Sequence, residues 1–371
     1  MLWLDMAARD YDAIVVGASF GGLAVARQLR GNILLIDRNE VGSVQTSACG
    51  TPLWVPQALG VSASVLQVHD RLNIRTPRRT ISYDLSAVPF CTFDYRVFCE
   101  GLFAQTSARF LQAGVTGFAE GAVTTTEGRF TAPVVVDCSG WRGAVVQAGA
   151  PDATTGAYSF GLETYTSLDD QGLWFLLDQK LIPHGLGWIF PVGAGSLIGL
   201  GSYVGRSKLK PPLDRYLRDQ GIAPGSYHGT YFPNRLLRAT VGKVFAVGDA
   251  AGQCLPLTAE GIRPAVYFGS ECGRIVQRVL DGAITLETGL ETYGRLVERY
   301  RGAYRTLRWV QWLAAHAPTR WFAALTELAA HHPILPHWWP RYGWCAASSV
   351  RAANHRVGAC AASHCTHLSV R

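Results

Sequence analysis

The fold is decided by the stretch Val15-Val16-Gly17-Ala18-Ser19-Phe20-Gly21-Gly22. The apolar run Tyr11–Val16 that enters it is typical of a buried strand, and Leu23–Arg30 after it has a helical pattern. A second apolar run, Ile33–Ile36, ends at Asp37, an acid 20 residues past the first glycine. This order and spacing predict a βαβ unit whose turn binds a dinucleotide.

Each part of the turn has a physical role in that prediction. Gly17 makes the tight turn, and Gly22 lets the helix and the strand approach closely. The helix beginning at Ser19 and Phe20 presents its first N–H groups and its positive dipole end to a pyrophosphate. Asp37, followed by Arg38, is placed to accept hydrogen bonds from a ribose. The alternative is an ordinary tight turn between a strand and a helix.

Composition limits the classes of partner. The chain has 371 residues, 48% of them hydrophobic and 16% charged, which suffices for a large core. Its net charge of +7 comes almost wholly from arginine, because the chain has only four lysines: Lys180, Lys208, Lys210 and Lys243. A basic chain can attract nucleic acid, anionic lipid or an anionic cofactor. No basic run with interleaved aromatic residues occurs, so we expect no nucleic-acid partner.

The cysteines indicate a reducing compartment. Nine cysteines occur without a C-x-x-C pair, and the nucleotide motif begins close to Met1, so we expect a cytoplasmic protein with free thiols. No run of 18 uncharged apolar residues predicts a membrane span. No metal site is predicted either, since the spacing of the C-terminal ligand-type residues fits no zinc pattern: His355, Cys360, His364, Cys365 and His367.

Nucleotide-type sequence is interrupted twice by sequence of β type. Alternation marks residues 65–83, and four strand-like segments follow later: Ala157–Tyr165, Leu173–Asp178, Gly187–Val192 and Ser196–Tyr203. Helical patterns cover 94–111, 261–280, 290–315 and 320–330. We therefore expect a mixed α/β fold, with a Rossmann-type domain, an inserted antiparallel-sheet domain for the substrate and C-terminal helices.

The expected boundaries follow from these interruptions. The nucleotide domain takes residues 11–64, 89–150 and 236–285, and the inserted domain takes 65–88 and 151–235. Residues 286–344 form the helical region. Residues 345–371, rich in Ala, Ser, His and Cys without periodicity, are expected to be a disordered tail.

A second nucleotide motif follows the strand-like run Val244–Val247. Gly248 and Asp249 come directly after that run, and Gly261 and Ile262 open a helix shortly afterwards. The Asp249 carboxylate can meet a ribityl or ribose hydroxyl, and the helix N-terminus can face a negative group of a flavin. The alternative is a plain exit from a strand into a turn.

These motifs, taken in chain order, resemble FAD-dependent proteins of the p-hydroxybenzoate hydroxylase fold. The resemblance includes Val15–Gly22, Asp37, the helix with Arg96, Val136–Gly140 and Gly248–Ile262. Two further segments resemble the geranylgeranyl reductase family: Ser47-Ala48-Cys49-Gly50 is similar to its Cys-Gly element, and Leu186-Gly187-Trp188-Ile189-Phe190-Pro191 to its aromatic-x-Trp-x-Phe-Pro motif. Ser19, Leu186 and Ala259 depart from the family pattern.

The resemblance implies FAD as the hydride carrier and the reduction of isolated C=C bonds in an isoprenoid chain. It implies that Cys49 and Gly50 lie near the flavin, with Cys49 as a candidate acid or relay, although a small buried thiol is the alternative. Trp188, Phe190 and Pro191 would line an apolar slot, or would simply be sheet core. Gly140 joins the cofactor site, and Arg96 is either a phosphate contact or a solvated helix residue.

Other functions of this fold stay open. A monooxygenase is disfavoured because Ser139 stands where hydroxylases have the Asp of an Asp-Gly pair. A halogenase is disfavoured because no lysine precedes Lys180. A non-catalytic flavin- or lipid-binding protein is the remaining alternative. No second strand–GxGxxG–helix unit occurs, so we expect the reductant to be an electron-donor protein or a briefly bound NAD(P)H.

The C-terminal helices bear on partners. Tryptophans at 309, 312 and 321 lie near arginines at 305, 308 and 320. This combination suits peripheral contact with a membrane, from which an isoprenoid substrate could enter. Packing of these helices against the substrate domain explains the pattern equally well.

Overall fold

A six-stranded sheet forms around the glycine turn. The computed structural model describes residues 10–119, 121–149, 158–318, 321 and 324. The sheet runs, from edge to edge, through β18 (Thr240–Val241), β19 (Val244–Ala246), β12 (Val134–Asp137), β1 (Ala13–Val16), β2 (Ile33–Asp37) and β8 (Arg109–Gln112). All neighbours pair in parallel except β18 with β19. The predicted βαβ unit is thus present.

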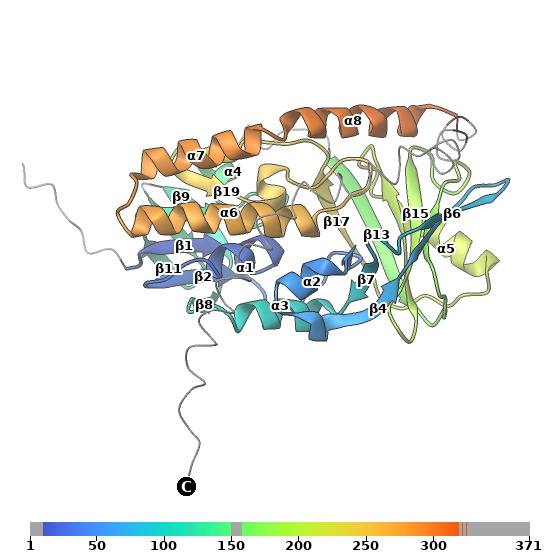
Figure 1. Ribbon diagram of the computed structural model, residues 1–371, viewed down its shortest axis with the longest axis horizontal. Coiled ribbons are helices and arrows are strands. Elements are labelled where there is room, and N and C mark those ends of the chain that lie inside the picture. The colour runs from blue at the N-terminus through green and yellow to red at the C-terminus, as the bar shows by residue number, and fades with distance from the viewer. Residues whose placement is uncertain (1–9, 120, 150–157, 319–320, 322–323, 325–371) are drawn as a thin grey trace, which may run out of the picture.

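Both faces of this sheet are covered, which explains why its central strands are almost wholly apolar. Ala13 and Val15 of β1 face the helices α1 (Phe20–Ala26), α3 (Tyr95–Phe103), α6 (Ile262–Leu280) and α7 (Leu286–Glu298). Ile14 and Val16 face the opposite layer, which holds α4 (Val146–Gly149) and the antiparallel strands β9 (Val115–Ala119), β10 (Ala122–Thr125) and β11 (Gly128–Thr131). Figure 1 shows α6 and α7 lying over the sheet.

A second, seven-stranded sheet lies beside the first (Figure 1). Its order is β17 (Tyr227–Pro233), β13 (Tyr158–Thr166), β16 (Ser196–Ser202), β15 (Gly185–Pro191), β14 (Leu173–Leu176), β5 (Arg71–Arg75) and β6 (Thr80–Asp84). Leu213 and Leu217 of α5 (Lys210–Asp219) pack on one face, against Ile189 and Ile198 among others. The opposite face is left for Glu163 and the residues that flank it across the strands.

A small sheet and a short helix lie between the two large sheets. The sheet is made of β3 (Gly50–Pro52), β7 (Phe90–Phe93) and β4 (Val65–His69), and the helix is α2 (Trp54–Ala58). β4 therefore pairs with β7 and not with the seven-stranded sheet. This arrangement brings the Cys49–Gly50 segment to the junction of the two large sheets.

The four strands predicted between residues 157 and 204 are confirmed by β13 to β16. The helix predicted over 94–111 is wrong after Phe103, because Arg109–Gln112 pairs with β2 as an edge strand. The helix predicted over 290–315 is two helices, α7 and α8 (Arg301–His316). Tyr300 at the break packs on Phe268 of α6, a contact that no local pattern reveals. β17 was not predicted.

Some predictions fall on residues outside the described part of the chain. These are most of the predicted helix 320–330, the tail 345–371 with its His and Cys residues, and residues 150–157. Within the described residues, no group of three or more His, Cys, Asp or Glu side chains could hold a metal ion. Nor does that part of the chain contain a helix with the length and apolar character that crossing a membrane requires.

Helix α8 lies along the top of the molecule in Figure 1 and connects both large sheets. Tyr304 donates to the Gln253 carbonyl oxygen at 2.6 Å, beside the nucleotide strands. Gln311 donates to Ser159 on β13 at 3.4 Å, and His184, which directly precedes β15, contacts the Ala315 carbonyl oxygen. Helix α8 therefore stabilises the position of one sheet relative to the other.

The left-handed backbone of Ala259 predicts that glycine at this position would make the protein more stable. This exposed residue has φ +54°, a left-handed conformation that costs an L-residue about 1–2 kcal/mol. Ala259→Gly should relieve this strain and, after the entropy cost of glycine, stabilise the protein by about 0.5–1 kcal/mol in urea unfolding. The control Ala303→Gly, at an exposed position inside α8, should destabilise it by about 1 kcal/mol. Equal effects of the two variants would contradict the prediction.

Candidate functional site

The predicted nucleotide residues converge because four parallel strands end at one edge of the first sheet. Gly17 follows β1, Asp37 ends β2, Gly140 follows β12 and Gly248 follows β19. The carboxyl ends of parallel strands lie on the same edge, and ligands of open α/β sheets bind there. Gly17 and Gly248, which are 231 positions apart in the sequence, are brought to the same edge in this way.

The glycine turn has no room for side chains. A Cβ atom at Gly17, where φ is +106°, would lie 2.2 Å from the Cys138 carbonyl oxygen. A Cβ at Gly22 would lie 1.8 Å from the Gly17 carbonyl oxygen. Both positions therefore require glycine, in agreement with the roles predicted for them.

Ser19 is the N-cap of α1, but its side chain makes no capping hydrogen bond. Its hydroxyl accepts a hydrogen bond from Tyr95 at 3.0 Å, which links the glycine turn to α3. The Phe20 ring is buried in an edge-to-face cluster with Phe93, Tyr95 and Phe98, with centroids 5.4–6.1 Å away. Only the backbone of Phe20 is thus available to a ligand.

Asp37 is tied to the turn that precedes it. One carboxylate oxygen accepts from the Ala18 amide at 2.8 Å, and the other accepts from the Asn39 amide at 2.9 Å. Arg38 is exposed beside it. Arg96 lies on the exposed side of α3, 3.5 Å from Glu100, and its predicted phosphate contact stays a prediction.

Asp137 is a structural residue that sequence reasoning did not single out. It is fully buried and accepts four hydrogen bonds, from the Ser139 amide and hydroxyl and from the Val145 and Val146 amides, at 2.6–2.9 Å. These bonds hold the loop in which Gly140 sits at φ +81° with open space beside it. An Asp directly after an apolar strand is the signal that could have revealed this role.

Asp249 has the opposite environment. It follows Gly248 in a 3₁₀ turn, and in the described part of the chain its carboxylate has no hydrogen-bond partner. Burial raises its pKa to about 6. The turn is held by Gln253, which accepts from the Gly248 amide at 2.7 Å and donates to Tyr293 at 3.0 Å. The fold thus holds an unpaired carboxyl group at the nucleotide edge.

The segment before α6 is irregular. Leu257 has φ +71° and accepts through its carbonyl oxygen from the Tyr203 hydroxyl at 2.8 Å. Gly261 is the N-cap of α6 and Ile262, its first residue, is buried. Glu260 pairs with the buried Arg263 at 2.5 Å and so closes this loop onto the helix.

Cys49 is fully buried and has a left-handed backbone, with φ +53°. Its thiol donates to the Ser47 carbonyl oxygen at 3.3 Å. Burial, and then the negative charge of Glu163, raise the pKa of the Cys49 thiol well above its usual value. The thiol is therefore protonated at neutral pH and is not a thiolate nucleophile.

Gly50 joins this segment to the second sheet. A Cβ atom at Gly50 would lie 2.8 Å from the Phe190 ring, so the ring packs directly on the glycine backbone. The Thr92 hydroxyl donates to the Pro191 carbonyl oxygen beside it. The structure thus brings the Cys49–Gly50 segment and the Phe190–Pro191 segment together, as a shared site requires.

The Trp188 ring packs on the backbone of glycine residues in the neighbouring strands. Cβ atoms at Gly161, Gly199 and Gly201 would lie 3.5, 2.2 and 3.2 Å from its ring. The indole N–H donates to Glu163 at 2.8 Å. Trp188 is therefore more than an apolar wall, because it also satisfies one oxygen of a buried carboxylate.

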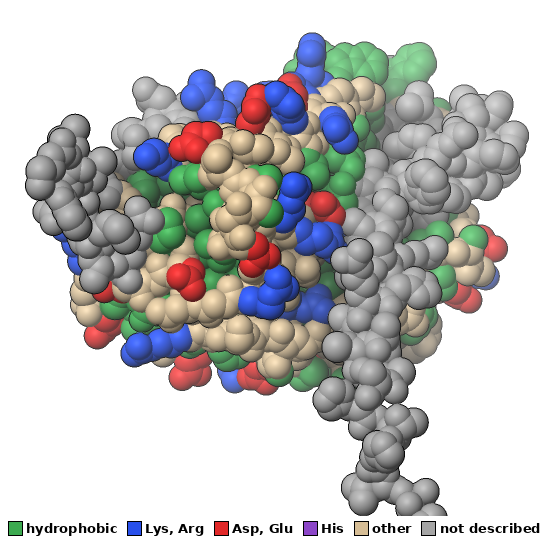
Figure 2. Space-filling view, turned by 60° about the vertical axis from the view of Figure 1, so that its left-hand side comes forward, with side chains coloured by type: hydrophobic (Ala, Val, Ile, Leu, Met, Phe, Trp, Pro, Cys, Tyr) green, Lys and Arg blue, Asp and Glu red, His purple; other side chains and the backbone are tan. Residues whose placement is uncertain are grey.

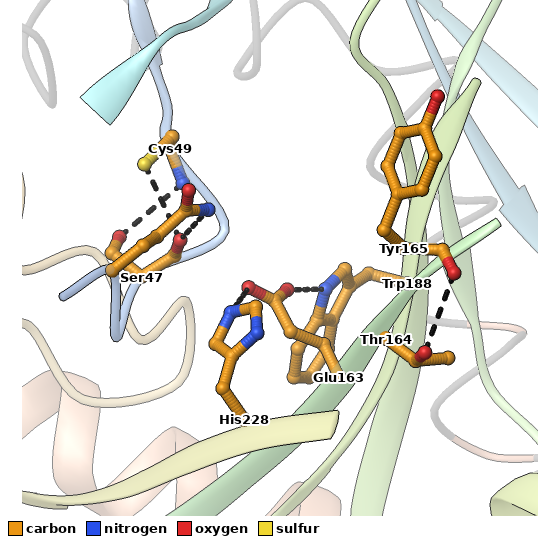
Figure 3. A network of polar contacts seen from close by, with 8 residues as sticks. Ser47, Cys49, Glu163, Thr164, Tyr165, Trp188 and His228 are labelled. Atoms are coloured by element: carbon orange, nitrogen blue, oxygen red, sulfur yellow. Dashed lines mark hydrogen bonds and ion pairs between the residues drawn. The ribbon is translucent and has the colours of Figure 1, made fainter. Parts of the chain in front are cut away.

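Glu163 and His228 are site residues that the sequence reasoning missed. Strand register sets Trp188, Gly199, Glu163 and His228 in one row across β15, β16, β13 and β17. Glu163, 4% exposed, contacts His228 Nε2 at 2.7 Å through its second oxygen. Figure 3 shows this pair and the Cys49 segment facing each other. A single charged residue inside an otherwise uncharged strand, Phe160 to Thr166, was the available signal.

Known proteins resemble this chain over part of its sequence and over most of its fold. No family model matches the chain. It is 30% identical over 144 residues, 37% of its length, to a digeranylgeranylglycerophospholipid reductase 2 of Methanothermobacter thermautotrophicus. The aligned part covers 36% of that protein. The chain thus matches about a third of the length of the curated relatives. Over this part of its sequence, the chain is similar to proteins named digeranylgeranylglycerophospholipid reductase.

Solved structures extend this similarity to most of the fold. A geranylgeranyl bacteriochlorophyll reductase-like protein of Thermoplasma acidophilum superposes with a TM-score of 0.79 at 18% identity, over 87% of this chain and 92% of that one. A probable FAD-dependent monooxygenase of Pseudomonas aeruginosa gives a TM-score of 0.63 at 15% identity, over 85% and 99%. The predicted Rossmann-type α/β fold is confirmed.

Ala259 and Leu186 are two of the positions at which the chain departs from the family pattern. Ala259, which stands for the glycine of the family's Thr-Gly-Glu-Gly pattern, keeps a left-handed backbone. Leu186, which stands for the first aromatic residue, is partly exposed on β15.

The raised pKa of Asp249 predicts how the stability of the protein depends on pH. Because its pKa is raised in the folded state, ionisation destabilises the ligand-free protein as pH rises from about 4 to 6, and the loss persists above pH 6. At pH 7.5, Asp249→Asn should therefore have a free energy of unfolding roughly 1–3 kcal/mol above that of the wild type, and should unfold at a higher temperature. At pH 4 the two proteins should unfold at the same temperature.

Asp137→Asn is the matched control in the same calorimetric measurement. Its carboxylate is fully hydrogen-bonded, so the substitution should destabilise the protein by about 1–3 kcal/mol. A destabilised Asp249→Asn variant at pH 7.5 would contradict the assignment of an unpaired carboxyl group.

Proposed function

We propose that the protein is an FAD-dependent oxidoreductase that reduces isolated C=C bonds of a geranylgeranyl-type isoprenoid chain. The observation that carries the proposal is the contact of Gly50 with Phe190. Through it, the Cys49 segment next to the nucleotide edge meets the aromatic strand of the second sheet. The named reductase relatives support the substrate class.

The nucleotide edge fits FAD. Gly17 and Gly22 clear the turn for a pyrophosphate, and Gly140 has open space where a side chain would stand. Asp37 would meet the ribose, and the unpaired Asp249 carboxylate would accept a hydrogen bond from a ribityl or ribose hydroxyl. Ser19, Phe20, Arg38, Cys49, Gly50, Arg96, Gly248, Gly261 and Ile262 complete the proposed cofactor site.

Bound FAD, once reduced, supplies a hydride. The chain's own residues must then hold the isoprenoid chain, exclude water and provide a proton, because an isolated alkene has no group that stabilises the developing charge. Trp188, Phe190 and Pro191 provide the apolar surface. Cys49, the candidate acid or relay, borders the site as a neutral thiol. The reductant is NAD(P)H or an electron-donor protein.

The test is direct. The purified protein should be yellow or become yellow with FAD, and after reduction with dithionite it should add two mass units per C=C bond to a geranylgeranyl lipid. A gain of 16 mass units would indicate a monooxygenase instead. Flavin binding without any product would indicate a non-catalytic carrier. A protein that stays colourless in excess FAD would refute the proposal.

Cys49→Ala tests the site within the same assay. We expect it to keep bound FAD and to lower the reduction rate at least tenfold, because Cys49 borders the reacting atoms. Cys91→Ala, which removes a buried thiol from β7, is the control and should keep the wild-type rate. Unchanged turnover in Cys49→Ala would remove Cys49 from the mechanism.

We propose further that α8 contacts an anionic membrane surface. Trp309 and Trp312 are 61% and 56% exposed, and Arg305 and Arg308 are exposed on the same helix. Figure 2 shows basic and hydrophobic side chains, with some acidic ones among them, along the upper edge of the molecule, which α7 and α8 form in Figure 1. Tryptophan anchors in the interface, and each arginine adds about 1 kcal/mol near anionic lipid.

Sedimentation with vesicles of anionic phospholipid measures this contact. The double variant Trp309→Ala/Trp312→Ala should bind at least tenfold more weakly than the wild type. Leu66→Ala/Val68→Ala, which removes exposed apolar side chains from β4, should bind like the wild type. A wild type that does not sediment with the vesicles would refute the membrane proposal.

A further inference from the structure

Cys49 is poorly suited to supply the proton of the reduction. Its thiol is fully buried and its negative form is disfavoured both by desolvation and by the charge of Glu163. A group that ionises with such difficulty is a poor acid. Reduction of an isolated alkene therefore needs a second proton donor beside Cys49.

His228 has the geometry of that donor. Its side chain is 29% exposed, so it can exchange protons with solvent, while its partner Glu163 is 4% exposed. Nε2 is 2.7 Å from the Glu163 carboxylate. Nδ1 has no partner among the residues that the structure describes. Figure 3 shows the imidazole and the Cys49 segment on facing sides of the site.

Glu163 determines which imidazole nitrogen is free. A carboxylate accepts hydrogen bonds but does not donate them. The imidazole therefore keeps a hydrogen on Nε2 and donates it to Glu163, and Nδ1 is the nitrogen that gains and loses a proton. Trp188 donates to the other Glu163 oxygen at 2.8 Å and stops the carboxylate from rotating. Gly199 makes this possible, because a Cβ there would lie 2.2 Å from the indole ring.

We propose that His228 is the catalytic proton donor of the reduction and that Glu163, held by Trp188, is its positioning residue. This inference rests on the proposed function. Protonated His228 transfers the Nδ1 proton to one alkene carbon, while the other carbon receives the hydride that the reduced flavin supplies. The C=C π bond is replaced by two C–H bonds. Neutral His228 keeps the hydrogen on Nε2, which still donates to the Glu163 carboxylate. Solvent then returns a proton to Nδ1.

The first experiment is independent of turnover. In ¹⁵N-histidine spectra of the flavin-free protein, neutral His228 should carry its hydrogen on Nε2, with the signal assigned by its loss in His228→Asn. In Glu163→Gln the amide oxygen can still accept from Trp188, which leaves the amide NH₂ facing His228. The hydrogen should therefore move to Nδ1. A wild-type ring with its hydrogen on Nδ1 would overturn the inference.

The second experiment measures single turnover of the flavin-loaded, reduced protein with a geranylgeranyl lipid. His228→Asn should bind FAD and lipid like the wild type and react about 10²- to 10⁴-fold more slowly, with partial rescue by added imidazole. Glu163→Gln should lower kcat with little change in KM. His184→Asn, at a histidine that precedes β15 and contacts Ala315 of α8, should keep the wild-type rate.

The outcomes separate the two proposals. An active wild type with an equally active His228→Asn variant overturns the role of His228 and leaves the proposed function intact. A flavin-loaded wild type that reduces no prenyl chain overturns the proposed function, and the role of His228 with it. Loss of FAD or lipid binding in His228→Asn, with no imidazole rescue, would show a structural role and also overturn the inference.

Discussion

The structure depends on the close approach of three backbone segments at the end of β1. With no Cβ at Gly17 or Gly22, the Gly17 backbone packs against the Cys138 carbonyl oxygen and the first turn of α1 packs against Gly17. Any side chain there would separate β1 from α1 and from the loop after β12. Because β2, β12 and β19 all pair in register with this core, the nucleotide edge exists only if this contact is made.

The second sheet is positioned by a few contacts far apart in the sequence. Phe190 packs on Gly50, Thr92 donates to the Pro191 carbonyl oxygen, and α8 bonds to residues of both sheets. A glycine at position 50 is essential for the first contact, since a larger residue would push the aromatic strand away. The distance between the Cys49 segment and the opposite strands is thus set by packing.

Glu163 and Asp249 show how differently the fold treats its acids. Glu163 has a partner for each oxygen, so the cost of burying it is offset by two hydrogen bonds. Asp249 has no such partner in the described residues, and its pKa rises to about 6. A satisfied acid can position a neighbour, whereas an unsatisfied one favours a ligand that brings a donor. The first suits the role proposed for Glu163 and the second suits a cofactor contact.

Local sequence determined the βαβ unit, the glycine positions and the strands of the second sheet, because these follow from steric limits and from periodicity over a few residues. Sequence reasoning failed at Arg109–Gln112, where pairing with β2 overrides a helical pattern, and at Tyr300, where contact with α6 accompanies the helix break. The row Trp188, Gly199, Glu163 and His228 could not be predicted. Its members lie on four strands, and only the register between those strands, set by tertiary packing, aligns them.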